Sequence, residues 1–365
     1  MGNRTTIQDI ADEAGVSKAT VSYILNNKPG KSISPATRVA VLAAAKKLQY
    51  FPSHSARALS GGSAGCIAVV VMGEKLKNYR FAGIMSGLRS ALAREGLDNV
   101  LLCSGRMRGE YTDYISNYLE GRVDGIVFIR TANHVPDEKS LALVRQRGIP
   151  FVAVDCGLKP HGFSTVELNY AEGAEAAAEY LLKNAPGKLV YLRPREDNLQ
   201  EQQRQKGVCA AAGCCGADRL EIRWFTSGDQ REDLENTALF QSIMENLQDI
   251  KSGDAVLFSW RDMAQIARLT CVQQGKAIQI GELSFSYAYC NPCDCALSIR
   301  EATAGKTAAE EILRLVRGES ARCVAVSPQL LFPGTQQLFY RQDSCAPASA
   351  AGLPADEEKG KNNNQ

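Results

Sequence analysis

Hydrophobic residues near the start of the chain recur at helical spacing and predict two short helices joined by a tight turn. Thr6 and Asp9 form a capping-box pattern that begins the first helix. Gly15 stands where that helix needs a left-handed residue to end, and Ser17 is a suitable N-cap for the second helix. The inward positions are Ile7, Ile10, Ala11, Ala14, Val16, Val21, Ile24 and Leu25. This layout is typical of a helix-turn-helix that reads DNA, although any small helical bundle contains such a pair.

A third helix is predicted to begin at Ser34 and Pro35, after a turn at residues 26–31. Its inward stripe is expected to consist of Val39, Leu42, Ala43 and Leu48. Pro52 breaks this helix, and Ser53 could cap a helix of about two turns that ends at a glycine pair, which is too short to be stable alone. By composition alone, residues 51–62 would be a linker.

From Cys66 onward, short apolar runs alternate with amphipathic stretches. Strands are predicted at residues 66–72, 99–103, 125–129, 150–154, 188–192, 255–258 and 277–281. Helices are predicted between them, for example at 84–95, 140–147, 171–183, 199–206 and 263–274. This alternation predicts parallel sheets with helices on both faces. About 270 residues of it exceed one compact sheet domain, so two lobes are expected. Residues 343–365 lack apolar periodicity and are predicted to be disordered.

The charge of the chain is unevenly distributed. The 365 residues carry a net charge of +2. Residues 1–62 hold eight basic and three acidic side chains, a balance of +5 that leaves −3 for the remainder. A basic module on a mildly acidic body is expected of a protein that binds the phosphate backbone of nucleic acid.

Several other classes of protein are disfavoured. The N-terminus has no apolar signal core, and no apolar run approaches the roughly 20 residues that span a bilayer, so a cytoplasmic protein without a membrane partner is expected.

The 12 cysteines are scattered through a long chain and are expected to be reduced thiols. Cys290, Cys293 and Cys295 could bind a metal or sense redox state, but three histidines and no second C-x-x-C leave the fourth ligand missing, so no metal or other cofactor is predicted. The chain has no phosphate loop, G-x-S-x-G or H-E-x-x-H pattern, which argues against an enzyme.

Residues 11–26, A-x-x-A-G-V-S-x-x-T-V-S-x-x-L-N, resemble the DNA-binding headpiece of the lactose/galactose-repressor (LacI/GalR) family of bacterial transcription regulators. The resemblance continues through P-S-x-x-A-R-x-L at residues 52–59. It implies that residues 51–62 are a hinge helix that orders on operator DNA. It also implies that a leucine, here Leu59, wedges open a base step in the minor groove.

The rest of the chain resembles the two-lobed, periplasmic-binding-protein-like core of the same family. The matching segments are NYRFAGIMSGL, GRVDGIVFI, IPFVAVD, R-x-K-G at residues 204–207, and PGTQQLFYR. The implied organisation is a helix-turn-helix domain at 1–50, the hinge at 51–62, an α/β core for effector binding and dimerisation at 63–342, and a tail at 343–365. In that architecture the chain crosses three times between the lobes, and a ligand lies in the cleft.

Residues suited to DNA contact cluster on the second helix. The resemblance places Lys18, Ala19 and Tyr23 at base-reading positions, while Thr20, Ser22 and Asn26 suit phosphates or sugars. Lysine can donate to guanine, and an alanine can contact a thymine methyl group. Tyrosine is less usual at position 23 than arginine or histidine, so a non-standard operator half-site is expected. The full expected DNA-binding set is Thr6, Ser17, Lys18, Ala19, Thr20, Ser22, Tyr23, Asn26, Ser55, Arg57 and Leu59.

Candidates for effector binding are spread over the core. Arg204 matches the arginine with which these repressors grip an effector hydroxyl or carboxylate, although a surface ion pair would also explain it. Asp155 ends a predicted strand, where parallel sheets deliver residues to ligands. Phe81 could stack on a sugar or base; Trp224 could too, although core packing explains an aromatic there equally well. Asp262 matches part of an N-D pair in the family, with Arg261 replacing the asparagine.

One departure from the family pattern concerns the effector. Where the family usually has G-F-D-D, this chain has Gly281, Glu282, Leu283 and Ser284. Leucine replaces the aspartate that would bind a sugar hydroxyl. Either Glu282 or Ser284 substitutes for it, or the effector is not a typical sugar.

The sequence therefore predicts a homodimeric, ligand-responsive repressor that binds a pseudo-palindromic operator. A tetramer is not expected, because the C-terminal residues lack leucine heptads. A solute-binding protein is the main rival, and the basic headpiece and missing signal peptide argue against it. A transcriptional activator on the same scaffold is the other alternative, which the sequence does not separate from a repressor.

Overall fold

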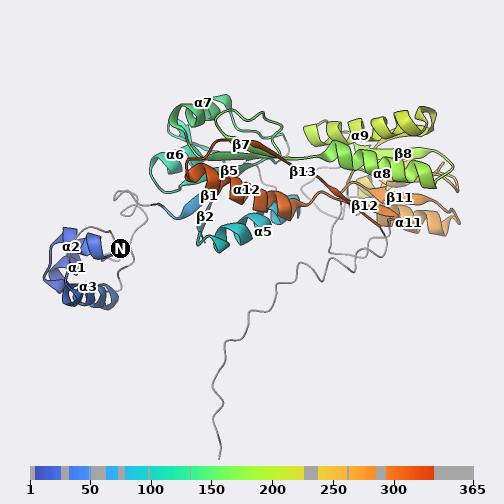
Figure 1. Cartoon of the computed structure of the whole chain (residues 1–365). Coiled ribbons are helices and arrows are strands. Elements are labelled where there is room, and N and C mark those ends of the chain that lie inside the picture. Colours follow the sequence, from blue (N-terminus) through green and yellow to red (C-terminus); the bar gives the residue numbers. More distant parts are fainter. Residues whose placement is uncertain are drawn as a thin grey trace, which may run out of the picture. The chain divides into compact units, whose positions relative to one another are not determined.

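The computed structural model describes residues 5–25, 33–48, 50, 63–72, 79–97, 99–131, 133–225, 237–260, 263–284 and 293–332. The described part consists of a small helical headpiece and two α/β units (Figure 1). The expected hinge at 51–62 and the expected disordered tail at 343–365 lie outside the described residues.

The headpiece is formed by three helices, α1 (Ile7–Ala14), α2 (Lys18–Leu25) and α3 (Pro35–Lys47). The predicted capping box is present, since the Thr6 backbone N–H donates to Asp9 Oδ2 at 2.7 Å and the Asp9 N–H donates to Thr6 Oγ1 at 3.3 Å. Gly15 ends α1 with a φ of 65°, a conformation that costs other residues free energy. The buried side chains are Ile10, Ala11, Val21, Ile24, Val41 and Ala44.

The predicted inward stripe of α3 was wrong at three of its four positions. Val39, Leu42 and Ala43 are exposed, and the helix instead buries Val41 and Ala44. Leu48 and Ala45 are partly buried against the same cluster. Positions 41, 44 and 45 have the same spacing as the predicted positions 39, 42 and 43, so periodicity alone could not distinguish the two faces.

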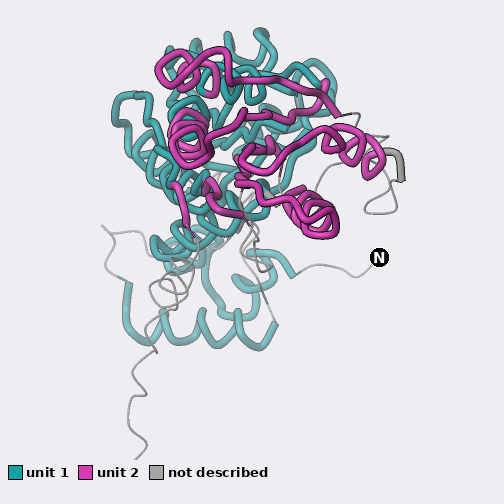
Figure 2. The backbone as a smooth tube through the Cα atoms, turned by 90° about the vertical axis from the view of Figure 1, so that its right-hand side faces the viewer, with its two compact units in different colours: residues 1–173, 196–207, 299–329 teal, residues 174–195, 208–298, 330–365 magenta. Residues whose placement is uncertain are grey.

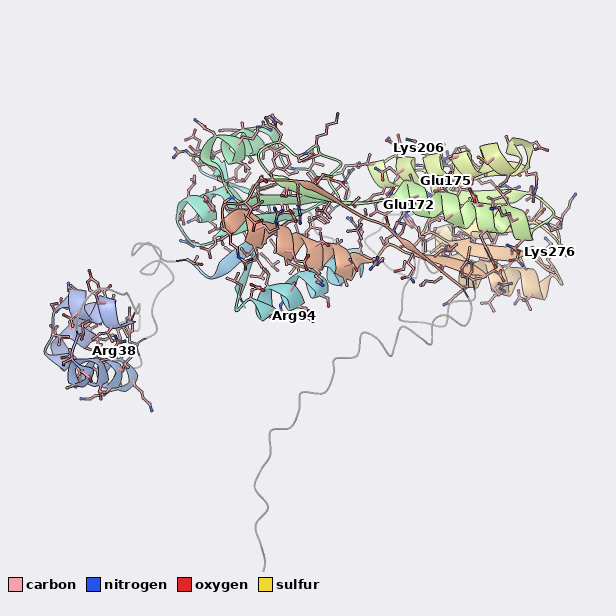
Figure 3. The ribbon with its side chains drawn as sticks, viewed as in Figure 1. Arg38, Arg94, Glu172, Glu175, Lys206 and Lys276 are labelled. Atoms are coloured by element: carbon pink, nitrogen blue, oxygen red, sulfur yellow. The ribbon has the colours of Figure 1, made fainter. Side chains whose placement is uncertain are left out.

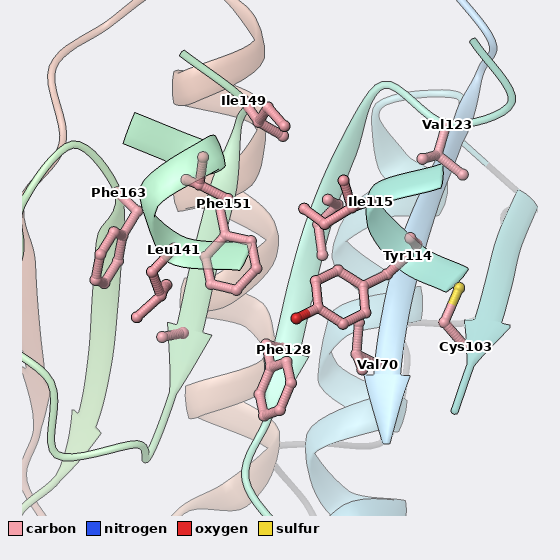
Figure 4. Packing of buried hydrophobic residues seen from close by; sticks show 14 of the residues in the cluster. Val70, Cys103, Tyr114, Ile115, Val123, Phe128, Leu141, Ile149, Phe151 and Phe163 are labelled. Atoms are coloured by element: carbon pink, nitrogen blue, oxygen red, sulfur yellow. The ribbon is translucent and has the colours of Figure 1, made fainter. Parts of the chain in front are cut away.

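Unit 1 contains a parallel sheet in the strand order β13-β7-β6-β5-β1-β2. The strands are β1 (Cys66–Val71), β2 (Asn99–Cys103), β5 (Gly125–Ile129), β6 (Phe151–Val154), β7 (Ser164–Leu168) and β13 (Cys323–Val326), and a hairpin is formed by β3 (Met107–Arg108) and β4 (Tyr111–Thr112). Helices α6 (Asp113–Leu119) and α7 (Glu138–Arg147) cover one face of the sheet through an aromatic cluster that includes Tyr114, Phe128 and Phe151 (Figure 4). The Tyr114 and Phe128 rings meet edge to face, with centroids 6.0 Å apart.

Helices α5 (Tyr79–Arg94) and α12 (Glu301–Val316) pack against each other at unusually close range. A Cβ atom on Gly87 would lie 1.9 Å from the Ala302 carbonyl oxygen, and one on Gly305 would lie 1.9 Å from the Ile84 carbonyl oxygen. The two glycines therefore allow backbone-to-backbone contact between the helices.

Unit 2 contains a second sheet in the strand order β14-β12-β11-β10-β8-β9. Its strands are β8 (Leu189–Pro194), β9 (Leu220–Phe225), β10 (Ala255–Phe258), β11 (Gln279–Glu282), β12 (Cys295–Ser298) and β14 (Gln329–Leu331). Helices α10 (Thr237–Leu247) and α11 (Met263–Gln273) share one apolar cluster with the sheet. On the other face, Leu181 of α8 (Tyr170–Asn184) lies against Gly281, while α9 (Leu199–Cys215) buries Val208 and Ala211.

Both units are discontinuous in sequence (Figure 2). Unit 1 comprises Met1–Gly173, Glu196–Gly207 and Ile299–Gln329, and unit 2 comprises the remaining segments. The chain therefore passes between the units five times rather than the predicted three. The two additional passages arise because the first turns of α9 group with unit 1, where their side chains bind residues of that unit.

Candidate DNA interface and effector site

The recognition helix α2 has one buried and one open side. Val21 and Ile24 lie in the headpiece core, whereas Ser17, Lys18 and Ala19 are exposed. Ser17 caps the helix by accepting the Thr20 N–H at 3.1 Å. Because the cap fixes the start of the helix, Lys18 and Ala19 project from its first turn, which is where a recognition helix contacts base edges.

The other predicted DNA-binding residues surround that turn or lie outside the described part. Thr20, Ser22 and Tyr23 are half-buried on α2, and Thr6 is exposed at the start of α1. Asn26, Ser55, Arg57 and Leu59 lie outside the described residues. Arg38 was not among the predicted residues, although it is an exposed cation on α3 of the same headpiece (Figure 3).

In unit 1, Asp155 joins three elements through one carboxylate oxygen. Asp155 Oδ2 accepts hydrogen bonds from Arg80 Nη1 of α5, from Tyr170 Oη of α8 at 3.0 Å and from Gln200 Nε2 of α9 at 2.6 Å. The side chain is almost fully buried, and its φ of 57° places the residue in the left-handed region. A strained backbone of this kind persists where surrounding contacts fix it.

Arg80 and Arg204 are the two guanidinium groups of this cluster. Arg80 Nη2 also donates to the Arg130 carbonyl oxygen. Burial alone would lower the pKa of Arg80, but Tyr170 and the Asp155 carboxylate raise it, so the group stays charged. Arg204 lies 5.0 Å above the Tyr170 ring centroid and donates to Glu201 Oε1 at 2.6 Å. The structure thus brings the predicted Asp155 and Arg204 together through Tyr170. Arg204 does form the ion pair within its helix that was considered from the sequence, but both side chains are buried and not on the surface.

A neighbouring carboxylate holds the loop that follows Asp155. The Gly157 N–H donates to both oxygens of Glu167, at 3.2 and 3.0 Å. Gly157 has a φ of 67°, and a Cβ there would lie 2.4 Å from Leu199 Cδ2 at the start of α9. Burial raises the pKa of Glu167 to about 7, and the charge of Asp155 adds to the shift. The loop is therefore held from one side by a carboxylate that titrates near neutral pH.

Arg80, Tyr170, Gln200 and Glu167 were missed by the sequence reasoning. Arg80 directly precedes the predicted Phe81, which is half-buried on α5, so the NYRF segment was the available signal. The other three offered no signal, because their partners are distant in sequence.

The remaining predicted effector residues lie in unit 2 or outside the described part. Glu282 is buried at the end of β11, where its Oε1 accepts the Ala264 N–H of α11 at 2.8 Å. A carboxylate at this position stabilises the start of α11. Leu283 is fully buried, and Ser284 is half-buried. Trp224 is 47% exposed on the edge strand β9, whereas Phe225 packs edge to face on Trp260 at 5.3 Å. Asp262 and Arg261 lie outside the described residues.

The structure also describes two of the three clustered cysteines, the potential metal ligands and the apolar character of the helices. Cys293 and Cys295 are buried, and burial raises the pKa of both thiols, that of Cys295 to about 12, while Cys290 lies outside the described part. No group of three potential metal ligands occurs among the described residues. None of the helices described here combines the length and apolar character required to cross a bilayer.

The sequence matches two known families over most of its length. Residues 6–53 match "Bacterial regulatory proteins, lacI family", and residues 66–287 match "Periplasmic binding proteins and sugar binding domain of LacI family". The first match contains all three helices of the headpiece, and the second contains the Asp155 cluster.

Individual proteins with a similar sequence or fold include several repressors. The chain is 28% identical over 271 residues to the transcriptional repressor PurR of Vibrio parahaemolyticus, which covers 74% of this chain and 77% of that protein. It is 30% identical over 207 residues to the maltose regulon regulatory protein MalI of Escherichia coli, covering 57% and 59% of the two chains. Its fold is similar to that of the lac repressor dimer bound to operator and the anti-inducer ONPF, with a TM-score of 0.68, 20% identity and coverage of 90% and 98%.

Proposed function

Because this chain belongs to the lacI family of bacterial regulatory proteins, we propose that it is a homodimeric repressor whose operator affinity is controlled by a small molecule. As a member of that family it is a DNA-binding transcriptional regulator and not an enzyme. The observation that carries the proposal is the headpiece, in which a capped helix presents Lys18 and Ala19 to solvent on a rigid three-helix core. Operator binding requires access to chromosomal DNA, so we also propose a cytoplasmic location.

The effector is proposed to bind beside the Asp155 cluster of unit 1 and to be a sugar or a related metabolite. Arg204 and Phe81 supply a guanidinium and an aromatic face, the two kinds of group that recognise polar ring compounds. Asp155 already accepts three hydrogen bonds on one oxygen, so its contribution includes holding Arg80, Tyr170 and Gln200 in position. In unit 2, Glu282, Trp224 and Asp262 remain candidates, although the Glu282 carboxylate also binds the start of α11.

The outer surface of α10 and α11 supports the homodimer. Phe240, Leu269 and Val272 are exposed there, the last two at 66% and 67%. Glu245 and Arg268 are the charged residues of these two helices. The other exposed residues of the two helices are mostly uncharged glutamines, Gln241, Gln265 and Gln273. A two-fold contact places a surface against its own copy, so a surface with exposed apolar side chains and few charges is suited to a second copy of this chain. A dimer would present two recognition helices to a pseudo-palindromic operator.

The proposal is tested by in vitro selection of double-stranded DNA with the full-length protein. Selection is run without additive and with maltose, cellobiose, D-ribose, guanine or hypoxanthine. We expect enrichment of a pseudo-palindrome, with operator affinity that falls steeply as salt rises, and a change in affinity with one class of additive. Enrichment of no palindromic sequence would contradict the proposed function.

A further inference from the structure

One carboxylate binds four consecutive residues at the point where the core begins. Asp124 Oδ2 accepts hydrogen bonds from Ser63 Oγ at 2.6 Å, from the Gly65 N–H at 2.7 Å and from the Cys66 N–H at 3.3 Å. Asp124 Oδ1 accepts the Ala64 N–H at 2.7 Å. The Asp124 N–H in turn donates to the Cys66 carbonyl oxygen at 2.8 Å. The side chain of a single residue thus fixes the whole segment from Ser63 to Cys66.

The Asp124 cluster lies between the predicted hinge and the sheet of unit 1. Ser63 is the first described residue after the segment 51–62, which the sequence predicts to be the hinge. Cys66 begins β1 and Asp124 immediately precedes β5, and these two strands are neighbours in the sheet of unit 1. Asp124 therefore connects the chain coming from the DNA-binding domain to the centre of a sheet, where the backbone has little freedom.

The four hydrogen bonds from residues 63–66 are all accepted by a carboxylate group. Hydrogen bonds to an ionised carboxylate are shorter and about twice as strong as those between neutral groups. A segment held by four of them is ordered before DNA binds. If they are lost, the segment must be ordered during operator binding, at a cost in conformational entropy for each residue.

We propose that Asp124 is a positioning residue that anchors the hinge to the effector-binding core, so that a change in the core reaches the DNA-binding domain through a fixed attachment. The proposal rests on the proposed function as an operator-binding regulator. Asp124 contacts no DNA and no effector in this role. It acts by keeping the chain between the core and the hinge short and rigid.

The structure offers a closely matched control. Asp113 binds a turn of the same unit in the same way, since its carboxylate accepts the Ser104 N–H at 2.8 Å, Ser104 Oγ at 3.1 Å and the Gly105 N–H at 3.0 Å. Both carboxylates are half-buried. The residues that Asp113 binds, Ser104 and Gly105, are about forty residues away from the hinge, whereas those that Asp124 binds adjoin it. Asp113→Asn therefore reports the cost of breaking such a cluster without affecting the attachment.

The experiment compares full-length Asp124→Asn, Asp113→Asn and the wild-type protein on the selected operator and on random duplex DNA. For Asp124→Asn we expect operator affinity to fall about tenfold, equivalent to about 1.4 kcal/mol, while affinity for random DNA changes less than about twofold. Asp113→Asn should leave both affinities within about twofold of wild type. Ser63→Ala, which removes only one exposed hydroxyl, should give a smaller loss of about threefold on the operator.

Circular dichroism and thermal unfolding establish that each variant is folded, and Ser63→Ala provides the test if Asp124→Asn does not fold. Equal loss of operator affinity in Asp124→Asn and Asp113→Asn would overturn the proposal, as would operator affinities of Asp124→Asn and Ser63→Ala within twofold of wild type. A wild-type protein that selects no operator would overturn the proposed function, and this inference with it. A wild-type protein that binds its operator while the variants bind equally well would overturn only the inference.

Discussion

The exposed amine of Lys18 is placed for direct base readout. Lys18 lies on the first turn of α2, and the hydroxyl of Ser17 fixes that turn. We therefore expect Lys18→Ala to relax sequence preference at one position of each half-site, at a cost of about 1–3 kcal/mol on the preferred base. Repeating the selection with the variant measures the loss. Lys206→Ala, which removes an exposed lysine of α9 (Figure 3), should leave the selected sequence unchanged. Equal weakening on specific and random DNA would instead assign Lys18 to the phosphate backbone.

Glu167 links the conformation of the Asp155 loop to pH. Burial raises the pKa of its carboxyl to about 7, above the ordinary value of 4.5. An acid with a raised pKa in the folded state binds its proton more tightly there than in the unfolded chain. Its contribution to stability is therefore complete below about pH 4.5 and is lost as the pH rises through about 7.

We accordingly expect Glu167→Gln to remove part of the pH dependence of stability. Between pH 5 and pH 8, the free energy of unfolding of the wild type should fall by about 2 kcal/mol more than that of the variant, because a glutamine cannot ionise. Urea unfolding at the two pH values measures the difference. Glu110→Gln, a change at an exposed glutamate of the same unit, is the control and should behave as wild type. Parallel pH profiles for Glu167→Gln and wild type would show that Glu167 does not titrate in this range.

At the scale of elements, hydrophobic pattern identified seven strands but not every buried one. Strands β7 and β12 lie inside the two sheets and were not predicted, because each mixes serine or another polar residue with few apolar ones. All seven predicted strands are present, because each is rich in apolar residues; six of them lie inside the two sheets and β2 lies at an edge. The edge strand β9 was missed, since four of its residues, Leu220, Glu221, Ile222 and Arg223, are only half-buried and mix polar with apolar side chains. Helix α12 was not among the helices named from the sequence, and its packing on α5 depends on glycine and alanine, which carry little hydrophobic signal.

The glycine contact between α5 and α12 should be sensitive to one added methyl group. Gly87→Ala or Gly305→Ala would place a Cβ against a carbonyl oxygen of the facing helix, so the helices must separate. We expect a loss of about 1–3 kcal/mol in the free energy of unfolding, measured by urea titration. Gly213→Ala on α9 is the matched control, since open space surrounds that position and alanine favours a helix by about 0.5–1 kcal/mol. Unchanged stability of both Gly87→Ala and Gly305→Ala would show that the helices do not touch at this point.

The candidate site was predictable only in part, because the residues that contact one another in it are far apart in the sequence. Asp155 and Arg204 could be named from local motifs, since each stands in a segment that resembles the family. The arrangement of the cluster could not be predicted, because Arg80, Tyr170 and Gln200 donate to Asp155 Oδ2 from three separate helices. The same limit applies to Asp124, whose partners lie about sixty residues earlier in the chain. A single sequence contains no information on such pairings.

At the scale of the whole molecule, the proposed function requires that two copies of the headpiece bind together. A monomer would bind a half-site with only one recognition helix, so operator affinity depends on the dimer. The chain gives a specific candidate for the contact, the α10–α11 face with Phe240, Leu269 and Val272. In a two-fold interface each substitution is introduced twice, which makes this face sensitive to charge.

Leu269→Glu should therefore convert the dimer to a monomer. In the proposed two-fold contact the new carboxylate would be buried in an apolar interface together with that of the second copy, where like charges cost several kcal/mol. We expect sedimentation equilibrium to show a dimer for wild type and a monomer for the variant at micromolar concentration, and operator affinity to fall at least about tenfold. Val316→Glu, at an exposed position of α12 in unit 1, should remain dimeric. If Leu269→Glu also remains a dimer with unchanged operator affinity, the two copies associate through another surface, and the uncharged face of α11 requires a different explanation.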